Sequence, residues 1–442
     1  MEYLLMKQRN VSVLAVLLTC ALLLSGCGGI FPGRATPTPD PTPEPTVAPT
    51  PAPAPTPEPT PTPAPVYDLN FSVGGTPLSA SAESLNLTQA APDEIDRLIT
   101  VLPALSALKT LELGTADAAA PTVSWEQIRA IQEAAPSVTI NYRVGINGYY
   151  FQLTDEILNL SHFPIADEGR VTLQVAKCMP NLRILDMDSC GVSDESMAVI
   201  RSALPGVDVI WRVFFGDAYS TRTDAERLLI SNPDRGNVPL TGEVMKGLYY
   251  CTKVKYLDLG HLTWLTDCGW AVNMPDLEVL IIAMTGIKDI SALANCPKLN
   301  YLEVQTTCIN DITPLAGLTQ LKDLNICYNF ALRDIRPLYG LDLRRLYIGS
   351  MTPIPNEQVE EYRKLHPDCK INTTTTNPTE EEWRKLEDGS WPPTSDPRYE
   401  QLYDEFQYYT NPNCYAYNEN DPYFYNRYEY PDPNAQQYQA WW

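Results

Sequence analysis

The chain has 442 residues, 40 of them proline, and a formal net charge of -22 at pH 7. Its apolar content of 44% suffices for a sizeable core, and most prolines lie before residue 66 or after residue 390, which predicts one folded body between them. The negative charge excludes a nucleic-acid or anionic-lipid surface, because either needs clustered Lys and Arg. It favours a cationic or neutral partner, or simply keeps the protein soluble.

Residues 1–26 have the pattern of an export signal peptide. Lys7 and Arg9 precede an apolar run from Val11 to Leu24, which is shorter than the roughly 20 residues of a membrane span. The run ends in LSGC, closing at Cys27, and this sequence resembles the lipobox of bacterial lipoproteins. The resemblance implies cleavage before Cys27 and a lipid on its thiol, which anchors the chain to the outer face of the cytoplasmic membrane. The alternative is an ordinary export signal with an incidental cysteine.

Residues 27–66 hold this anchor and a stalk. Thr-Pro, Ala-Pro and Glu-Pro pairs dominate between Pro32 and Pro65. Proline fixes φ and removes a backbone donor, so we expect a disordered, extended polyproline II segment. At about 3.1 Å per residue it reaches on the order of 100 Å. Stalks of this composition are sometimes O-glycosylated, which the sequence leaves open.

Residues 67–107 are expected to be an N-terminal cap, since a stacked fold must cover its open end. Gly74 and Gly75 lie between the segments FSV and TPL. Both glycines accept positive φ, so the pair predicts a tight hairpin.

Residues 108–350 carry a repeated apolar pattern, LxxLxL. The five clearest copies begin 23, 22, 22 and 22 residues apart, at Val254, Leu277, Leu299, Leu321 and Leu343. Two earlier copies begin at Leu108 and Leu182, which lie 74 and 72 residues before the next copy. Those gaps are close to three repeats each, so we expect roughly ten to twelve turns in all.

The two long upstream units look like a duplication. Each is expected to contain an amphipathic helix, from Ser124 to Ala135 in the first unit and from Ser193 to Leu204 in the second. Each helix leads to an apolar strand, at residues 138–140 and 207–209, and then to a matching Thr-Asp segment.

The spacing resembles the leucine-rich repeat family, whose consensus places Asn, Cys or Thr three residues after the last apolar position. A small polar side chain there satisfies the backbone groups that the turn buries. The position holds Cys190, Thr285, Thr307 and Asn329, but it fails at Ala116, Leu262 and Met351. Turns at the three misfits are expected to be irregular.

Three later copies, from Ile287, Ile309 and Leu332, resemble the internalin-type variant, in which a 3₁₀-like turn replaces the outer helix. The family resemblance implies an α/β leucine-rich repeat solenoid. Its curved parallel sheet forms the concave face, and short helices and 3₁₀ turns form the convex face.

In each copy the leucines point into the core, and the residues between them point to the concave face. The tyrosines among them supply rigid contact area with a polar tip, which interfaces favour. We therefore predict a solvent-facing ligand-binding stripe, and the alternative is an ordinary solvated sheet. This stripe, named here the concave row, consists of Tyr256, Asp258, Val279, Ile281, Tyr301, Glu303, Gln305, Asp323, Asn325, Arg345 and Tyr347.

Catalysis, cofactors and metals are not expected. Of the 11 cysteines, nine remain once Cys20 leaves with the signal and Cys27 is lipidated, and they have no zinc-site spacing. Single buried thiols are expected instead, with Cys327 as the exception that faces solvent on the concave side. The sequence contains no GxSxG, HExxH, P-loop or SxxK motif.

Residues 351–376 are expected to form a C-terminal cap, with a helix from Glu357 to His366 and a strand at residues 369–371. Residues 377–442 form an acidic tail rich in Tyr and Trp, expected to be partly disordered. Its aromatic side chains either stack on sugar rings, fold back as a cap, or form a sticky tail.

These features predict a lipid-anchored cell-surface protein that presents its repeats to a protein or peptide. The alternative is a structural lipoprotein that binds cell-wall glycan through the aromatic tail. Neither hypothesis involves nucleic acid, and both leave the oligomeric state open.

Overall fold

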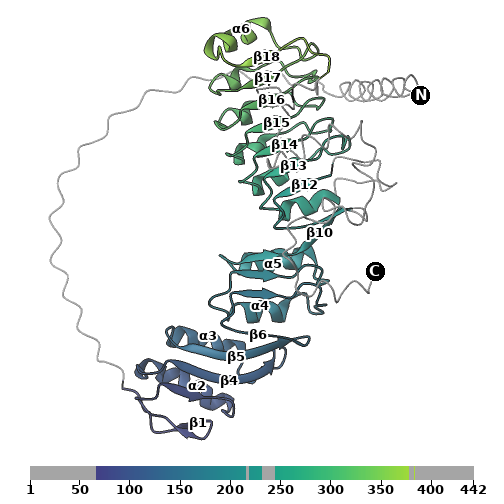
Figure 1. Ribbon diagram of the computed structural model, residues 1–442. Coiled ribbons are helices and arrows are strands. Elements are labelled where there is room, and N and C mark those ends of the chain that lie inside the picture. The colour runs from purple at the N-terminus through teal and green to yellow at the C-terminus, as the bar shows by residue number, and fades with distance from the viewer. Residues whose placement is uncertain (1–65, 216–218, 231–243, 378–382, 384–442) are drawn as a thin grey trace, which may run out of the picture. The chain divides into compact units, whose positions relative to one another are not determined.

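The computed structural model describes residues 66–215, 219–230, 244–377 and Trp383 (Figure 1). A compact unit begins at Tyr67. The signal peptide, the lipid attachment site at Cys27, the stalk, and the tail apart from Trp383 lie outside the described residues. None of the described helices is long and apolar enough to cross a membrane.

The regular copies form a seven-stranded parallel sheet whose strands follow one another in chain order. The middle leucines of the five copies are paired in register and fully buried: Leu257, Leu280, Leu302, Leu324 and Leu346. The predicted register is therefore confirmed. The strands are β12 (Arg227–Leu229), β13 (Tyr256–Asp258), β14 (Val279–Ile281), β15 (Tyr301–Glu303), β16 (Asp323–Asn325), β17 (Arg345–Tyr347) and β18 (Lys370–Asn372).

Two longer units precede this sheet, and they have matching element orders. The first contains β3 (Ser84–Asn86), α2 (Pro92–Val101), the 3₁₀ turn η2 (Leu102–Ala104), β4 (Thr110–Asp117), α3 (Trp125–Ala134), β5 (Thr139–Ile146) and β6 (Tyr149–Gln152). The second contains β7 (Ile157–Asn159), α4 (Arg170–Ala176), β8 (Ile184–Asp186), α5 (Asp194–Ala203), β9 (Asp208–Ile210), β10 (Arg212–Phe215) and β11 (Tyr219–Arg222). Each has three parallel strands and ends in an antiparallel hairpin, β5–β6 or β10–β11.

Parallel pairing starts at β3, inside the segment expected as the N-terminal cap. The hairpin upstream of it joins β1 (Ser72–Val73) to β2 (Thr76–Pro77). Gly74 and Gly75 have φ of 56° and 78°, the left-handed conformation that a two-residue hairpin turn requires. The hairpin predicted from these glycines is confirmed.

The helices begin where serine can cap them. Ser124 Oγ accepts a hydrogen bond from the backbone N–H of Gln127 at 3.2 Å, and Gln127 Oε1 accepts one from the backbone N–H of Ser124 at 3.1 Å. This capping box satisfies two donors at the start of α3. Ser193 plays the corresponding part for α5 by accepting from the backbone N–H of Ser196 at 3.3 Å. Both predicted helices are confirmed to within one residue at either end.

Buried polar side chains hold the turns that leave the strands. Thr285 Oγ1 donates to the carbonyl of Ile282 at 2.8 Å, and Thr307 Oγ1 donates to the carbonyl of Val304 at 3.0 Å. Asn329 Nδ2 donates to the carbonyls of Val304 and Ile326, both at 3.0 Å. Asn329 Oδ1 accepts from the backbone N–H and the hydroxyl of Thr307, at 3.2 and 2.8 Å. These bonds satisfy backbone groups that the turns remove from water.

These hydrogen bonds between polar turn residues of successive repeats are named here the turn ladder. Thr352 continues the turn ladder at the repeat where Met351 departs from the consensus. Met351 is 47% exposed, whereas Thr352 is only 5% exposed. Thr352 Oγ1 donates to the carbonyl of Ile326 at 2.9 Å and accepts from the backbone N–H of Asn329 at 3.3 Å. The irregularity expected at this turn is thus a shift of the polar residue by one position.

We expect Asn329→Ala to lower the free energy of unfolding by about 2–4 kcal/mol, because buried carbonyls and the Thr307 groups lose their partner. The matched control is Asn181→Ala, which removes one exposed amide with a single 3.3 Å bond and is expected to cost less than about 0.5 kcal/mol. Urea unfolding measures both. Equal losses in the two variants would mean that the ladder is not what holds these turns.

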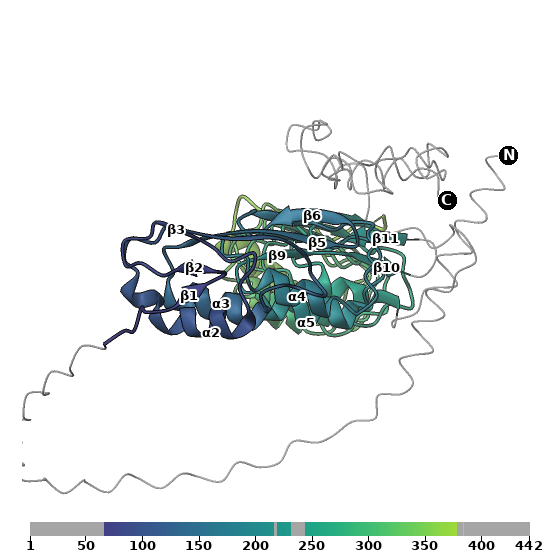
Figure 2. The same ribbon diagram turned by 90° about the horizontal axis from the view of Figure 1, so that it is seen from below.

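Short 3₁₀ turns lie on the convex side of the regular repeats. They are η3 (Val244–Tyr250), η4 (Gly269–Asn273), η5 (Ser291–Asn295), η6 (Thr313–Leu315) and η7 (Arg336–Leu338). The 3₁₀ turns expected in the three later copies are confirmed. The last helix, α6 (Asn356–Leu365), and β18 form the expected C-terminal elements. Figure 2 shows α2 to α5 together on one side of the sheets, and this layering is that of an α/β leucine-rich repeat solenoid.

Candidate functional site

The concave row lies on one face of β13 to β17, as its register predicts, but it does not face solvent. None of its residues has more than 8% of its surface exposed, and Cys327 beside it is 0% exposed. The prediction of a solvent-facing stripe is therefore wrong, and so is the prediction that Cys327 faces solvent. Alternation along a strand tells which face a side chain is on, but not whether another part of the chain covers that face.

Trp383 packs against this face. The indole is 0% exposed, and its Nε1 donates to Glu303 Oε1 at 2.8 Å. Its ring lies 4.8 Å from the ring of Tyr347 and 5.4 Å from that of Tyr301. Arg345 Cζ lies 5.0 Å from the ring centroid. One hydrogen bond, two aromatic contacts and a cation–π contact hold the indole in place.

The apolar part of the concave row packs as a cluster separate from the main core. Val279 and Ile281, expected as an exposed patch, are both 0% exposed. The sheet is therefore packed on both of its faces. This concave cluster consists of Tyr256, Val279, Ile281, Ala283, Tyr301, Cys327, Tyr347 and Trp383.

Glu303 lies at the polar centre of the row. Its carboxylate accepts hydrogen bonds from the hydroxyl of Tyr301, from Gln305 Nε2 at 2.9 Å, and from the indole of Trp383. Gln305 is 2% exposed, and its Oε1 accepts no hydrogen bond in the part of the chain that the structure describes. Leaving such an oxygen unpaired costs free energy, so it is a place where a donor from a ligand would bind favourably.

The side chains of Asp258 and Asn325 accept hydrogen bonds from the backbone. Asp258 Oδ1 accepts from the N–H of Gly260 at 2.8 Å, and Asn325 Oδ1 accepts from the N–H of Cys327 at 3.2 Å. This Asx turn, from a side chain to the N–H two residues on, ends a strand and turns the chain. The same bond follows other strands, at Asn86, Asn159, Asp186 and Asn372.

Asp323 is neutralised by two arginines. It is 1% exposed and pairs with Arg345 Nε at 2.8 Å and with Arg344. Burial acts to raise the pKa of Asp323, but the hydrogen bonds and charges of Arg345 and Arg344 outweigh it, and the pKa is lowered. The row is therefore not a free acidic stripe.

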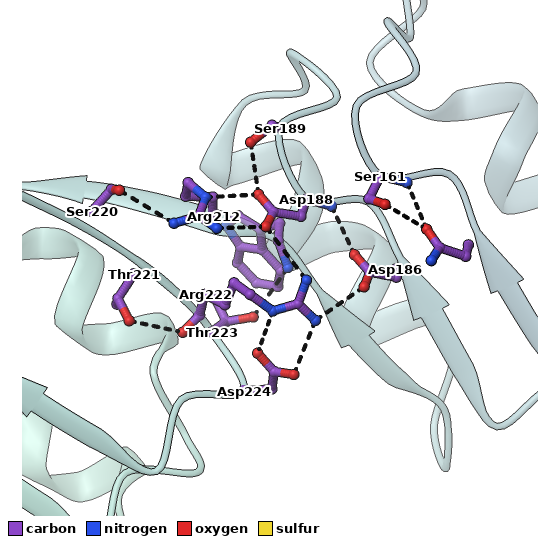
Figure 3. A network of polar contacts seen from close by, with 12 residues as sticks. Ser161, Asp186, Asp188, Ser189, Arg212, Ser220, Thr221, Arg222, Thr223 and Asp224 are labelled. Atoms are coloured by element: carbon purple, nitrogen blue, oxygen red, sulfur yellow. Dashed lines mark hydrogen bonds and ion pairs between the residues drawn. The ribbon is translucent and has the colours of Figure 1, made fainter. Parts of the chain in front are cut away.

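A second buried network lies where the hairpin β10–β11 meets β8 (Figure 3). Arg222 Nη2 contacts Asp186 Oδ2 at 3.0 Å, Nη1 contacts Asp188 Oδ2 at 3.4 Å, and Nε contacts Asp224 Oδ1 at 3.0 Å. Arg212 donates two hydrogen bonds to the carboxylate of Asp188, from Nε at 2.9 Å and from Nη2 at 2.8 Å. All but Arg212 and Asp224 are buried.

The pKa values of the two aspartates in this network are shifted in opposite directions. Burial raises the pKa of Asp186. Burial also acts to raise the pKa of Asp188, but the hydrogen bonds and charge of Arg212 outweigh it and lower the pKa. The network thus joins the hairpin β10–β11 to β8 through ion pairs of Arg212 and Arg222 with Asp186 and Asp188.

The duplicated first unit has a different hairpin. In the hairpin pairing, Arg143 is opposite Gln152 and Arg212 is opposite Arg222, so Arg143 corresponds to Arg212 and Gln152 corresponds to Arg222. Gln152 is uncharged and exposed, so it cannot form an ion pair with a buried carboxylate. Arg222 is therefore what distinguishes the second unit.

The eight described cysteines are free thiols. Burial raises the pKa of Cys190 and Cys251 to about 12, which makes them poor nucleophiles. Cys190 Sγ donates to the carbonyl of Leu160 at 2.9 Å, so it fills the polar turn position. Among the described residues, no group of three or more His, Cys, Asp or Glu side chains is placed to hold a metal ion.

Sequence reasoning missed Trp383 and Arg222. The signal for Trp383 is that a chain with tyrosines along one strand face also carries tryptophans in its tail. The signal for Arg222 is the comparison of the duplicated units, in which the corresponding residue of the first unit is the uncharged Gln152.

No family model matches the chain, and no curated protein matches it either. Among solved structures it is similar to internalin C2 from Listeria monocytogenes, with 20% identity over 58% of this chain and 85% of that one, at a TM-score of 0.29. It is also similar to internalin InlF from the same organism, with 21% identity over 64% and 67% of the two chains, at a TM-score of 0.26.

A leucine-rich repeat protein from Leptospira interrogans is similar at 13% identity over 68% of this chain and 95% of that one, with a TM-score of 0.19. Identities and TM-scores this low carry no argument about function. The chain's own strand register and turn ladder assign it the leucine-rich repeat fold.

Proposed function

We propose that this chain is a cell-surface binding protein that presents the concave side of its repeats to a protein or peptide. The observation that carries the proposal is the concave cluster, which gathers tyrosine, isoleucine and valine side chains on the sheet face opposite the main core. Interfaces favour tyrosine, tryptophan and arginine. Tyr301, Tyr347 and Arg345 provide that chemistry here.

The lipid anchor belongs to the same proposal, although Cys27 and the stalk at residues 27–66 lie outside the described residues. It is supported by the LSGC sequence and by the proline-rich segment behind it. We expect Cys27→Ala to move the exported protein from the membrane fraction to the medium. Retention of the variant in the membrane fraction would contradict lipid attachment at this residue.

The test of concave-face binding is a selection of displayed peptides on the full chain. Selected peptides are then measured against the double variant Tyr301→Ala, Glu303→Ala, and we expect affinity to fall at least about tenfold, because the contact area and the central acceptor are both removed. The two side chains are buried, so the variant is also less stable. Binding is therefore measured well below its unfolding midpoint, with circular dichroism to verify the fold.

The matched control is the convex pair Asp334→Ala, Arg336→Ala, whose ion pair is exposed. It should leave peptide binding unchanged. Peptides that bind the concave variant as tightly as the parent chain would overturn the proposal.

Glycan binding through the aromatic tail is the competing function. Trp383 is fully buried, so this tryptophan does not present a face to a sugar ring. The rest of the tail lies outside the described residues. Sedimentation with purified peptidoglycan tests the alternative, and binding that survives the concave double variant would favour it.

A further inference from the structure

We propose that Tyr301, Glu303, Arg345 and Tyr347 form a receptor site for an indole side chain, which Trp383 of the same chain occupies in place of a partner's tryptophan. The inference rests on the proposed function and deepens it, because it names the chemistry of the partner. That partner is a peptide segment with a tryptophan, and it competes with Trp383.

The site matches each chemical feature of an indole. The Nε1 donor meets the carboxylate of Glu303 at 2.8 Å. The π-system contacts the rings of Tyr347 and Tyr301 at 4.8 and 5.4 Å, both tilted, and the guanidinium of Arg345 lies over the ring. These are the favourable geometries for aromatic and cation–π contacts.

The carboxylate makes the site selective for tryptophan over phenylalanine. Glu303 is 0% exposed with the indole in place, and a phenylalanine ring in the same position would leave its carboxylate without that donor. A site built to bind a donor discriminates strongly against an analogue without one. We expect a phenylalanine analogue to bind at least about tenfold more weakly.

Trp383 occupies the site as a ligand rather than as part of a repeat. It is 80 residues from Glu303 in the chain, it lies beyond the last strand of the sheet, β18, and its cluster is separate from the main core. The buried Oε1 of Gln305, which accepts no bond among the described residues, provides a further acceptor beside Glu303. A peptide backbone N–H next to a bound tryptophan would satisfy it.

The experiment removes the internal ligand and adds a free one. The full chain and Trp383→Ala are titrated with N-acetyl-tryptophanamide by calorimetry. We expect saturable binding to the variant, and at least about tenfold weaker binding to the parent chain, where Trp383 competes. N-acetyl-phenylalaninamide should bind the variant at least about tenfold more weakly than the indole does.

Trp264→Ala is the matched control. Trp264 is outside the concave cluster, so this variant keeps Trp383 in place and should bind the amide no better than the parent chain. In the Trp383→Ala background, Glu303→Gln keeps an acceptor oxygen and should retain part of the binding, whereas Glu303→Leu should abolish it. A merely structural role for Glu303 would not separate these two changes.

If Trp383→Ala does not fold, Trp383→Phe serves instead, because it keeps a ring in the site but lacks the donor. A folded variant of either kind that does not bind the indole amide overturns the inference. Selected peptides that bind the concave face without any tryptophan also overturn it, yet leave the proposed function standing. Indole binding with no peptide binding at the concave face would overturn the proposed function and leave the indole site standing.

Discussion

Arg222→Ala is expected to lower the free energy of unfolding by about 3–5 kcal/mol. Arg222 is 4% exposed and holds Asp186, Asp188 and Asp224 together. Removing it leaves the buried carboxylate of Asp186 without its counter-charge, whereas Asp188 keeps Arg212, and an uncompensated buried charge costs more than the pair itself contributes. Equilibrium unfolding in urea at pH 7 measures the loss.

Two further variants test whether the loss comes from the buried charges. Arg183→Ala removes the exposed pair with Glu156 and should cost less than about 1 kcal/mol. Asp186→Asn should recover part of the loss in the Arg222→Ala background, because the pKa of Asp186 is already raised by burial and the neutral amide needs no counter-charge. If the second change made the first one worse, the network would not be governed by charge.

Asp323→Ala is expected to cost about 3–5 kcal/mol at pH 7, since it leaves the buried Arg345 without its carboxylate. The pKa of Asp323 is lowered in the folded chain. Its contribution to stability is therefore fully present above the unfolded pKa of about 3.9. It is lost as the pH falls through the folded pKa.

The difference between the parent chain and Asp323→Ala should accordingly shrink on going from pH 7 toward pH 3. Other titrating groups occur in both proteins and largely cancel in this difference. Unfolding free energies at the two pH values provide the check. A difference that stays constant would show that the ion pair with Arg344 and Arg345 does not stabilise the folded state.

The repeat register could be predicted from the sequence because it is local. A period of 22 residues fixes which leucine faces the core and which neighbour faces away, and the pairing of Leu280 with Leu302 follows from it. The polar turn residues could be predicted for the same reason. Thr307 and Asn329 are one repeat apart and hydrogen-bond directly.

The state of the concave row could not be predicted in this way. Whether Tyr301 is exposed depends on Trp383, which lies far along the chain and has no periodic relation to the strands. The Asx turns are a partial exception. Asp258 and Asn325 end their strands, and Asp or Asn at that place favours a turn over a ligand contact.

The covered concave face can be tested directly on the full chain labelled with 5-fluorotryptophan. The chain has eight tryptophans, and the fluorine resonance of Trp383 is identified by its loss in Trp383→Phe. A buried indole has no solvent to exchange around it, so we expect this resonance to show no shift between H₂O and D₂O. A shift as large as that of free 5-fluorotryptophan would contradict the docking of Trp383 on Tyr301 and Tyr347, and with it the occupied binding face.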